Sequence, residues 1–169
     1  YQEQGFRTPT GKVELRLSTA EKFGLKPLPE FTALPEEEDP ELPLILTSAK
    51  NPYYLISSYR WVQSLRTKCP EPVLEIHPDT ARQYGIADGD QVIVETANGQ
   101  IKQKANVTDG VHPQVVSADL GWWFPEADPQ TQFDWQTSNF NMLTSVRTLG
   151  KEFGTPNLKN IPCRVRKAH

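Results

Sequence analysis

The sequence predicts a mainly β protein in which about six short strands close into a barrel. The clearest signal is QVIVETANGQIKQKANV at residues 91–107, where apolar and polar residues alternate on both sides of an Asn-Gly pair, as is typical of a β-hairpin. Four further short apolar runs, LILT, PVLEI, QVVSA and IPCRV, stand between residues that end strands. The chain lacks the strand–helix alternation of a parallel α/β sheet, so a closed or nearly closed β-barrel with a few short helices is the predicted fold.

Two parts are predicted, residues 1–43 and residues 44–169. In the first part, the alternation of VELRL at residues 13–17 predicts a lead-in strand. STAEKFG then predicts a short helix that begins at its Ser-Thr pair and ends at Gly24. From residue 27 to 43, PLPEFTALPEEEDPELP is rich in proline and acid, which predicts a linker ahead of the barrel domain.

Within the second part, LILTSA predicts the first strand, and apolar residues near helical spacing predict a helix over residues 54–65. PVLEIHP predicts a strand. HPDTARQYG predicts a short helix that His77 starts and Gly85 closes. The hairpin is predicted to turn at Asn98-Gly99, with positive φ at both residues of a type I′ turn. PQVVSAD and NIPCRV predict the last two strands.

Composition and charge exclude several classes of function. The 169 residues are 37% hydrophobic and carry a net charge of −3 without a clustered basic stretch, so no nucleic-acid partner is expected. The two cysteines, Cys69 and Cys163, show neither a CxxC pair nor metal-ligand spacing, so we expect no structural zinc and no iron–sulfur cluster held by this chain alone. No apolar run approaches the roughly 20 residues that span a bilayer, so no direct membrane insertion is expected.

Several motifs together carry a family resemblance. IHPDTARQYGIADGDQVIVETANGQI, followed by VTDGVHPQVVSADLGWW, SNFNMLT and LKNIPCRV, resembles the C-terminal dinucleotide-binding domain of the molybdopterin oxidoreductases, the dimethyl sulfoxide reductase family. The similarity runs from Leu44 to Val165, and FRTPTGKVEL resembles the segment that leads into that domain. The order and spacing of the motifs are specific. The resemblance implies a double-psi β-barrel, which is a six-stranded barrel with interlocked loops, as in the C-terminal domains of formate dehydrogenases.

The resemblance also implies a site for molybdopterin guanine dinucleotide that begins at the end of the first strand. The residues that match the family's first cofactor loop are Thr47, Ser48, Ala49, Lys50, Tyr54, Leu55, Ser57 and Ser58. Backbone amides, hydroxyls and an ammonium group suit a pterin and a pyrophosphate. The family often has an arginine near Lys50 and a histidine near Leu55, and this sequence has neither, so a point charge replaces a bidentate fork.

A second group of matching residues comes later in the chain: Trp122, Phe133, Asn141 and Lys159. Asn141 in NMLT matches the family's Asn-x-Leu-Thr, and its amide suits the edge of a pterin or guanine ring. An aromatic ring at Phe133 can cover a ring face, and Lys159 can neutralise phosphate or bond a ring carbonyl. Trp122, in GWW, matches a turn beside the cofactor. Packing in the core explains the two aromatic residues equally well, and helix capping explains the serines and threonines.

In the family, the metal is molybdenum or tungsten, held by the dithiolenes of two such cofactors and often by a Cys, Ser or selenocysteine of another domain. Neither Cys69 nor Cys163 matches that ligand. The resemblance therefore implies no catalytic or metal-ligating residue here, and an isolated domain that binds part of a cofactor without performing the reaction. It assigns a 4Fe-4S cluster to the parent enzyme, the remaining domains and electron-transfer subunits as partners, and either the cytoplasm or the periplasm of a prokaryote as the compartment.

The alternative is a non-catalytic double-psi barrel that recognises a protein partner, as at the N-termini of AAA-type ATPases. The GIADGD segment and its hairpin fit that class. A partner-binding barrel gives no reason to expect NMLT, GWW or the later LK spacing. Clustering of Lys50, Asn141 and Lys159 around one groove would favour the nucleotide interpretation. An exposed apolar groove would favour a protein partner.

Overall fold

The computed structural model describes residues 1–28, 30, 39–147, 149–150 and 154–168. The chain forms two compact units, Tyr1–Glu37 and Glu38–His169. Most of the predicted proline- and acid-rich linker, residues 31–38, lies outside the described residues.

The first unit contains the short helix α1 (Ser18–Glu21), which the sequence predicts. Gly24 follows it with the left-handed φ of 71° that is common after a helix. The predicted side-chain cap is wrong, because Leu17 holds the N-cap position and no side chain bonds the helix start. The predicted strand at residues 13–17 is also wrong, because its apolar side chains are exposed and the segment pairs with no strand in the described ranges.

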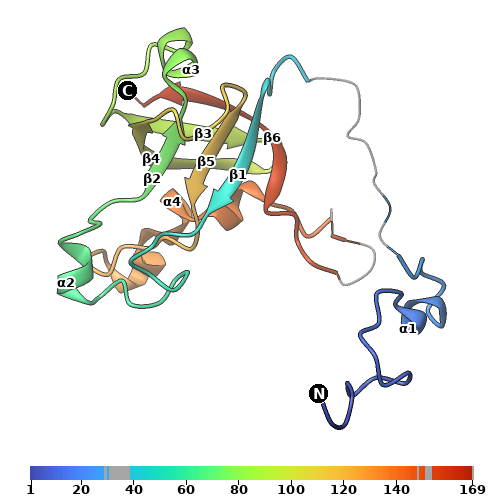
Figure 1. Cartoon of the computed structure of the whole chain (residues 1–169). Helices are drawn as coiled ribbons and strands as arrows, with labels where there is room; N and C mark the ends of the chain where they lie inside the picture. The colour runs from blue at the N-terminus through green and yellow to red at the C-terminus, as the bar shows by residue number, and fades with distance from the viewer. Residues whose placement is uncertain (29, 31–38, 148, 151–153, 169) are drawn as a thin grey trace. The chain divides into compact units, whose positions relative to one another are not determined.

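Six strands form a closed barrel in the second unit (Figure 1). They are β1 (Leu44–Ala49), β2 (Val73–Ile76), β3 (Gln91–Thr96), β4 (Gly99–Val107), β5 (Val115–Asp119) and β6 (Lys159–Lys167). Their order is β1-β5-β2-β4-β3-β6, and β6 pairs again with β1. The pairs β1–β5 and β2–β4 are parallel, and the remaining pairs are antiparallel. The predicted mainly β barrel is therefore confirmed.

The strand directions gather the long connections at one end of the barrel. The connections from β1 to β2 (residues 50–72), from β3 to β4 (97–98) and from β5 to β6 (120–158) all lie at this end, which we call the long-loop end. Figure 1 shows α3 at the opposite end. The first connection passes β5 and the last passes β1, so the two loops interlock, as the resemblance to a double-psi barrel implies.

Short helices decorate these connections. The first long connection contains α2 (Gln63–Arg66), and the last contains η1 (Pro129–Asp134), α4 (Trp135–Ser138) and η2 (Phe140–Leu143). The buried faces of the strands fill the barrel with aliphatic side chains, among them Leu46, Leu74, Val92, Val94 and Ile101. Each fully buried side chain of this kind contributes roughly 1.5–3 kcal/mol to stability. Phe140 and Leu143 of η2 belong to the same core, so η2 closes the long-loop end.

The predicted helix over residues 54–65 is wrong for most of its length. Ile56 and Tyr59 have φ of 54° and 70°, which a right-handed helix excludes. The segment instead turns tightly, with an isolated bridge between Leu55 and Ser58, and helix begins only at Gln63. The apolar spacing reflects residues that pack on a neighbouring loop or remain exposed.

The predicted hairpin is confirmed, but the predicted type I′ turn is wrong. Thr96 pairs with Gly99, so Ala97 and Asn98 form the loop, and neither has positive φ. Gly99 is required for space, because a Cβ there would lie 2.7 Å from the Met142 carbonyl oxygen. The hairpin therefore packs closely against η2.

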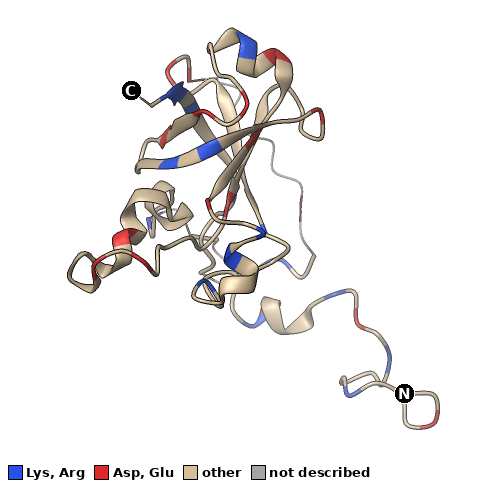
Figure 2. Ribbon diagram, turned by 90° about the vertical axis from the view of Figure 1, so that its left-hand side faces the viewer, with Lys and Arg blue, Asp and Glu red and all other residues tan. Residues whose placement is uncertain are grey.

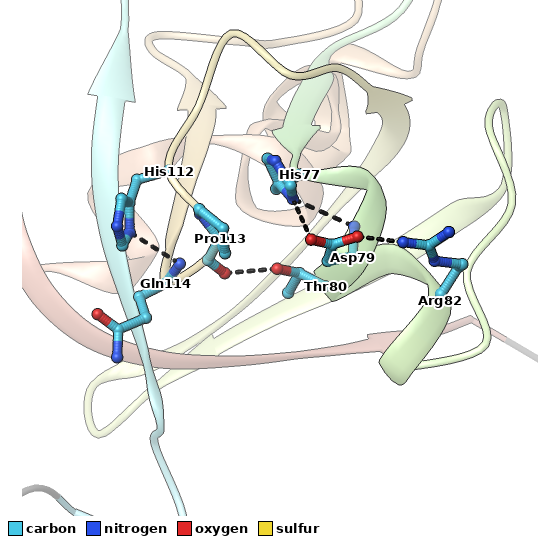
Figure 3. A network of polar contacts seen from close by, with 7 residues as sticks. All are labelled: His77, Asp79, Thr80, Arg82, His112, Pro113 and Gln114. Atoms are coloured by element: carbon cyan, nitrogen blue, oxygen red, sulfur yellow. Dashed lines mark hydrogen bonds and ion pairs between the residues drawn. The ribbon is translucent and has the colours of Figure 1, made fainter.

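At the opposite end, α3 (Pro78–Gln83) is capped as the sequence predicts. Nδ1 of His77 accepts a hydrogen bond from the Asp79 amide at 3.1 Å, and Gly85 follows the helix with a φ of 65°. The Thr80 hydroxyl donates to the Pro113 carbonyl and so ties the helix to the connection that precedes β5 (Figure 3).

Charges of both signs are distributed over the barrel rather than gathered in one basic face (Figure 2). No helix in the part of the chain that the structure describes has the length and hydropathy needed to cross a membrane.

Replacing Gly99 by valine should lower the free energy of unfolding by about 1–3 kcal/mol, because the added Cβ meets a backbone oxygen that η2 holds in place. Urea denaturation measures the change. Gln100→Val, at the exposed next position of β4, is the matched control and should change stability by no more than about 0.5 kcal/mol. Equal effects of the two substitutions would contradict this packing.

The Glu95–Arg164 pair should make stability depend on pH. Two hydrogen bonds of 3.1 and 2.8 Å join these side chains across β3 and β6, and they lower the pKa of Glu95 from its usual 4.5. A lowered carboxyl pKa stabilises the fold above the unfolded value, and this contribution is lost as pH falls through the folded value. Glu95→Gln should therefore be less stable than the parent at pH 7, and the difference should disappear as pH falls below the folded-state pKa of Glu95.

A double-mutant cycle with Arg164→Gln provides the control for that pair. The two single substitutions should be non-additive at neutral pH and additive in acid. Additivity at both pH values would show that the pair contributes nothing.

Candidate functional site

The end of β1 and the start of β6 lie side by side at the long-loop end. Thr47 stands opposite Ser117 of β5 and Lys159 of β6, and the β1–β6 register shifts between Leu46 and Thr47. The amide of Ser48 donates to the Leu158 carbonyl at 3.1 Å beside this irregularity. The fold thus brings together the first matching loop and Lys159, which are far apart in sequence.

Asn141 reaches the same end through η2. The amide of Asn141 donates to Oδ1 of Asn139 at 3.1 Å, and Nδ2 of Asn139 donates to the Trp122 carbonyl at 2.9 Å. The Thr96 hydroxyl donates to the Leu143 carbonyl, which fixes the other end of the turn. The Asn141 side chain is exposed and bonds no other described residue.

Two cations accompany Asn141. Lys50 and Lys159 are exposed, and neither forms an ion pair with a described residue. Free ammonium groups at the same end of the barrel as an amide and strand-end hydroxyls can bind an anionic ligand that also offers hydrogen-bonding edges.

Two of the predicted site residues have buried side chains. Tyr54 and Trp122 are 6% and 0% exposed and pack edge to face, 5.7 Å between ring centroids. The Tyr54 hydroxyl donates to the Cys69 carbonyl at 2.7 Å. The structure therefore places both rings behind the surface, where they support the loops rather than face solvent.

The buried pair encloses a cation that sequence reasoning missed. The Arg60 guanidinium lies 4.0 Å from the Tyr54 ring centroid and 3.9 Å from that of Trp122, and Arg60 is 0% exposed. Its Nη2 donates to the carbonyls of Ile56 and Leu120 at 3.0 and 3.3 Å. Arg60 thus bonds both long loops at once.

The two loops also meet directly at Gly121, whose φ is 72°. A Cβ on Gly121 would lie 2.8 Å from Cγ2 of Ile56 and 2.9 Å from the Ser57 nitrogen. Nε1 of Trp123 donates to the Ser57 carbonyl at 2.6 Å. Phe133 packs on Trp123 with ring centroids 5.4 Å apart, so this predicted site residue also lies at the loop crossing.

An apolar surface lies beside the polar groups. Leu55, Ile56, Tyr59 and Trp61 are 65%, 47%, 48% and 61% exposed. The rings of Tyr59, Trp61, Trp123 and Phe133 follow one another with centroid separations of 6.2, 6.0 and 5.4 Å. The long-loop end therefore carries both the polar groups expected of a nucleotide site and the exposed apolar residues expected of a protein-binding site.

A pocket of about 190 Å³ opens on the outer wall of the barrel beneath the end of β1. It is lined by Ala49, Lys50, Asn51, Pro52, Val73, Glu75, Ser117 and Asp119. Oδ2 of Asp119 accepts hydrogen bonds from Nδ2 of Asn51 at 3.1 Å and from the Val73 amide at 3.2 Å. Burial raises the pKa of Asp119 in spite of these bonds. The carboxyl group ties the first loop to β2 and β5.

Arg60, Asn51, Gln103 and Asp119 are the residues that sequence reasoning missed. Gln103 is fully buried, and its Nε2 donates to the carbonyls of Asp119 and Ser138 at 3.1 and 3.2 Å. The alternation along β4 places Gln103 among the inward-facing residues, so that signal could have found it. No pattern in the sequence marks Arg60 as buried.

No group of three or more His, Cys, Asp and Glu within the described ranges could hold a metal ion. Both cysteines are buried, and burial raises the pKa of Cys163 to about 12. Nδ2 of Asn51 lies 3.0 Å from Sγ of Cys69, whose pKa burial also raises.

The comparison with protein families decides the identity of the barrel. Residues 44–162 match the family model described as "Molydopterin dinucleotide binding domain". The chain belongs to the molybdopterin dinucleotide-binding family. The matched range begins with β1 and ends within β6, so it includes the whole long-loop end.

Relatives and a solved structure agree with this assignment. Dopamine dehydroxylase of Eggerthella lenta is 32% identical over 97% of this chain, and acetylene hydratase of Syntrophotalea acetylenica is 36% identical over 92%. The solved acetylene hydratase from Pelobacter acetylenicus superposes with a TM-score of 0.85 and 33% identity over 98% of the chain. The chain spans 17%, 23% and 24% of these proteins, respectively. It is a molybdopterin dinucleotide-binding domain of the dimethyl sulfoxide reductase family.

Because both thiols of the domain are buried and their pKa values are raised, iodoacetamide at about pH 8 should label neither in the folded chain and both in strong denaturant. Mass spectrometry of the labelled peptides measures this. Rapid labelling of Cys163 in the folded chain would contradict its position inside the barrel.

Proposed function

We propose that the domain covers one molybdopterin guanine dinucleotide in a larger enzyme, with its long-loop end toward the cofactor. The observation that supports this most directly is the placement of Lys50, Asn141 and Lys159 at one end of the barrel, exposed and without side-chain partners among the described residues. An anionic pyrophosphate linked to two hydrogen-bonding ring systems fits this set of groups.

The chemistry of each residue indicates which part of the cofactor it would bind. Lys50 and Lys159 supply positive charge for phosphate, and the Asn141 amide offers a donor and an acceptor to a ring edge. The hydroxyls of Thr47, Ser48, Ser57 and Ser58, with backbone amides and Ala49 at the strand end, complete the polar wall. Leu55 and Phe133 cover an apolar ring face of the cofactor. The bound cofactor would supply the dithiolene sulfurs that hold molybdenum or tungsten.

Tyr54 and Trp122 have a supporting role in this proposal, since their side chains are buried behind the loops. They remain among the cofactor-site residues only through their backbone and through the loops that they hold. The departure from the family at Lys50 gives this domain a point charge where a bidentate contact is common.

The remainder of the enzyme completes the active site. We assign the protein ligand of the metal, a 4Fe-4S cluster and contacts with electron-transfer subunits to polypeptide outside these residues. The exposed aromatic residues Tyr59 and Trp61 face the other domains, since relatives are several times longer than this chain. This accounts for the apolar surface without a free-standing recognition domain.

The substrate is determined elsewhere in the enzyme. The relatives are named for dehydroxylation, for hydration of acetylene, and for reduction of thiosulfate and dimethyl sulfoxide. These relatives share similarity to this domain but are named for different substrates. The function proposed for this domain is therefore limited to binding the cofactor.

Substitution in the full-length enzyme tests the site. Lys50→Ala and Lys159→Ala should each reduce the guanine dinucleotide retained after gel filtration by about tenfold, because a lost charge-assisted bond costs roughly 1.5–3 kcal/mol. Asn141→Ala should reduce it by a smaller factor, because a neutral hydrogen bond contributes roughly 0.5–1.5 kcal/mol. Arg82→Ala, an exposed change on α3 at the opposite end, is the control and should retain the cofactor. Retention by all three site variants would contradict the proposal.

The isolated 169-residue chain should contain no stoichiometric molybdenum or tungsten and show no dye-linked reductase activity, since it offers one wall of a cofactor site. Elemental analysis and the dye assay measure these two properties. Metal at one atom per chain, or turnover, would overturn the division between this domain and the rest of the enzyme.

A further inference from the structure

We infer that Arg60 is a positioning residue that locks the turn at residues 55–58 against Gly121 in the conformation that faces the cofactor. The inference rests on the proposed function, because it assigns that turn to the cofactor wall. Arg60 has no exposed surface of its own, so its effect on a ligand passes through the turn.

The contacts of Arg60 bridge two segments that are remote in sequence. The guanidinium carbon lies 4.0 Å from the Tyr54 ring centroid and 3.9 Å from that of Trp122, in the corner formed by these two perpendicular rings, one from each long connection. Nη2 donates to the Ile56 carbonyl in the turn and to the Leu120 carbonyl just before Gly121. One side chain therefore joins the turn to the neighbouring loop.

The turn needs such a constraint. Ile56 is β-branched and has a φ of 54°, and Tyr59 has a φ of 70°. A non-glycine residue in this region costs roughly 1–3 kcal/mol and persists only where surrounding contacts determine it. The Ile56 residue is 47% exposed, so the packing of its own side chain offsets only part of this strain. The bonds from Arg60 to Ile56, and from Trp123 to Ser57, hold the strained backbone as well.

The burial of Arg60 is itself costly. Its Nε and Nη1 have no hydrogen-bond partner, and Arg60 forms no ion pair, among the described residues. Desolvation lowers its pKa, and the largest opposing effect comes from the charge of the Asp119 carboxyl group. Apolar residues can often replace buried ions without loss of stability. The role of Arg60 is therefore to fix the conformation of the loops rather than to stabilise the fold.

The chemistry of the contact is specific to arginine. A guanidinium is planar, packs closely on aromatic rings and donates hydrogen bonds in fixed directions, whereas an ammonium group is a compact charge on a flexible stem. Lysine at position 60 should therefore fail to position the turn even though it preserves the charge.

The test uses the full-length enzyme and three variants: Arg60→Met, Arg60→Lys and Arg60→Ala. Hydrogen exchange of amides 55–59 and of the barrel amides 92–94 is measured together with retained guanine dinucleotide. In Arg60→Met and Arg60→Lys the turn amides should exchange about tenfold faster or more, while amides 92–94 keep their protection and Tm falls by no more than a few degrees. Retained cofactor should fall by about tenfold.

Chemical rescue separates positioning from general packing. Methylguanidine at millimolar concentration should fill the space left in Arg60→Ala, slow exchange of the turn amides and restore cofactor retention. Methylamine, which lacks the planar fork, is the matched control and should restore neither. If Arg60→Ala does not fold, Arg60→Met and Arg60→Lys still decide the matter through exchange and retention.

Unchanged exchange of amides 55–59 in Arg60→Met would overturn the inference. Loss of protection at amides 92–94 together with the turn would also overturn it, because Arg60 would then support the whole domain. If the Arg60 variants retain the cofactor while Lys50→Ala and Lys159→Ala lose it, the inference about Arg60 is wrong and the proposed function still holds. Retention in all of these variants would count against the cofactor site itself.

Discussion

The contact of one buried guanidinium with two aromatic rings connects the barrel to its candidate site. Arg60 lies against both Tyr54 and Trp122, at about 4 Å from each ring centroid, and it bonds a carbonyl in each long loop. The strand pairing of the barrel does not determine how these loops fold, because residues 50–72 and 120–158 leave the sheet altogether. Their mutual arrangement depends on this contact and on the close approach of Gly121 to Ile56.

The barrel supplies the frame on which this arrangement is built. Parallel pairing of β1 with β5 brings the ends of both strands, and hence the starts of both long loops, to the same level. Gln103 extends the frame inward, because its side chain bonds both Asp119 at the end of β5 and Ser138 at the end of α4. Gly99 and Thr96 then seat η2, which presents Asn141. The polar groups of the site therefore project from elements that the core fixes.

The barrel was predictable from the sequence, whereas the loops were not. The alternation of β3 and β4 and the short apolar runs determine strands because each side chain has one face to bury. The spacing in residues 54–65 is compatible with a helix, but Ile56 and Tyr59 adopt positive φ in a turn that packs against a residue far later in the chain, Gly121. The predicted turn type at Asn98 was wrong for a related reason. Gly99 is needed because the Met142 carbonyl lies close to it, and not because its backbone is left-handed.

The candidate site shows the same division between local pattern and tertiary contact. Motif matching identified Lys50, Asn141 and Lys159, and the fold places all three at the long-loop end. The motifs do not distinguish exposed residues from buried supporting ones. They therefore predict Tyr54 and Trp122 as site residues together with Leu55 and Ser57, although the first two are buried in the structure. Arg60 could not be found from a single sequence, because an arginine after a tyrosine is usually a solvated surface residue.

The most direct test of this account is an experimental structure of the full-length enzyme with its cofactor bound. The guanine dinucleotide should contact Thr47–Lys50, Asn141 and Lys159 at the long-loop end, with Arg60 still packed against Tyr54 and Trp122 behind the wall. A cofactor bound at the opposite end beside α3, or an Arg60 side chain turned outward to the ligand and away from both rings, would contradict it.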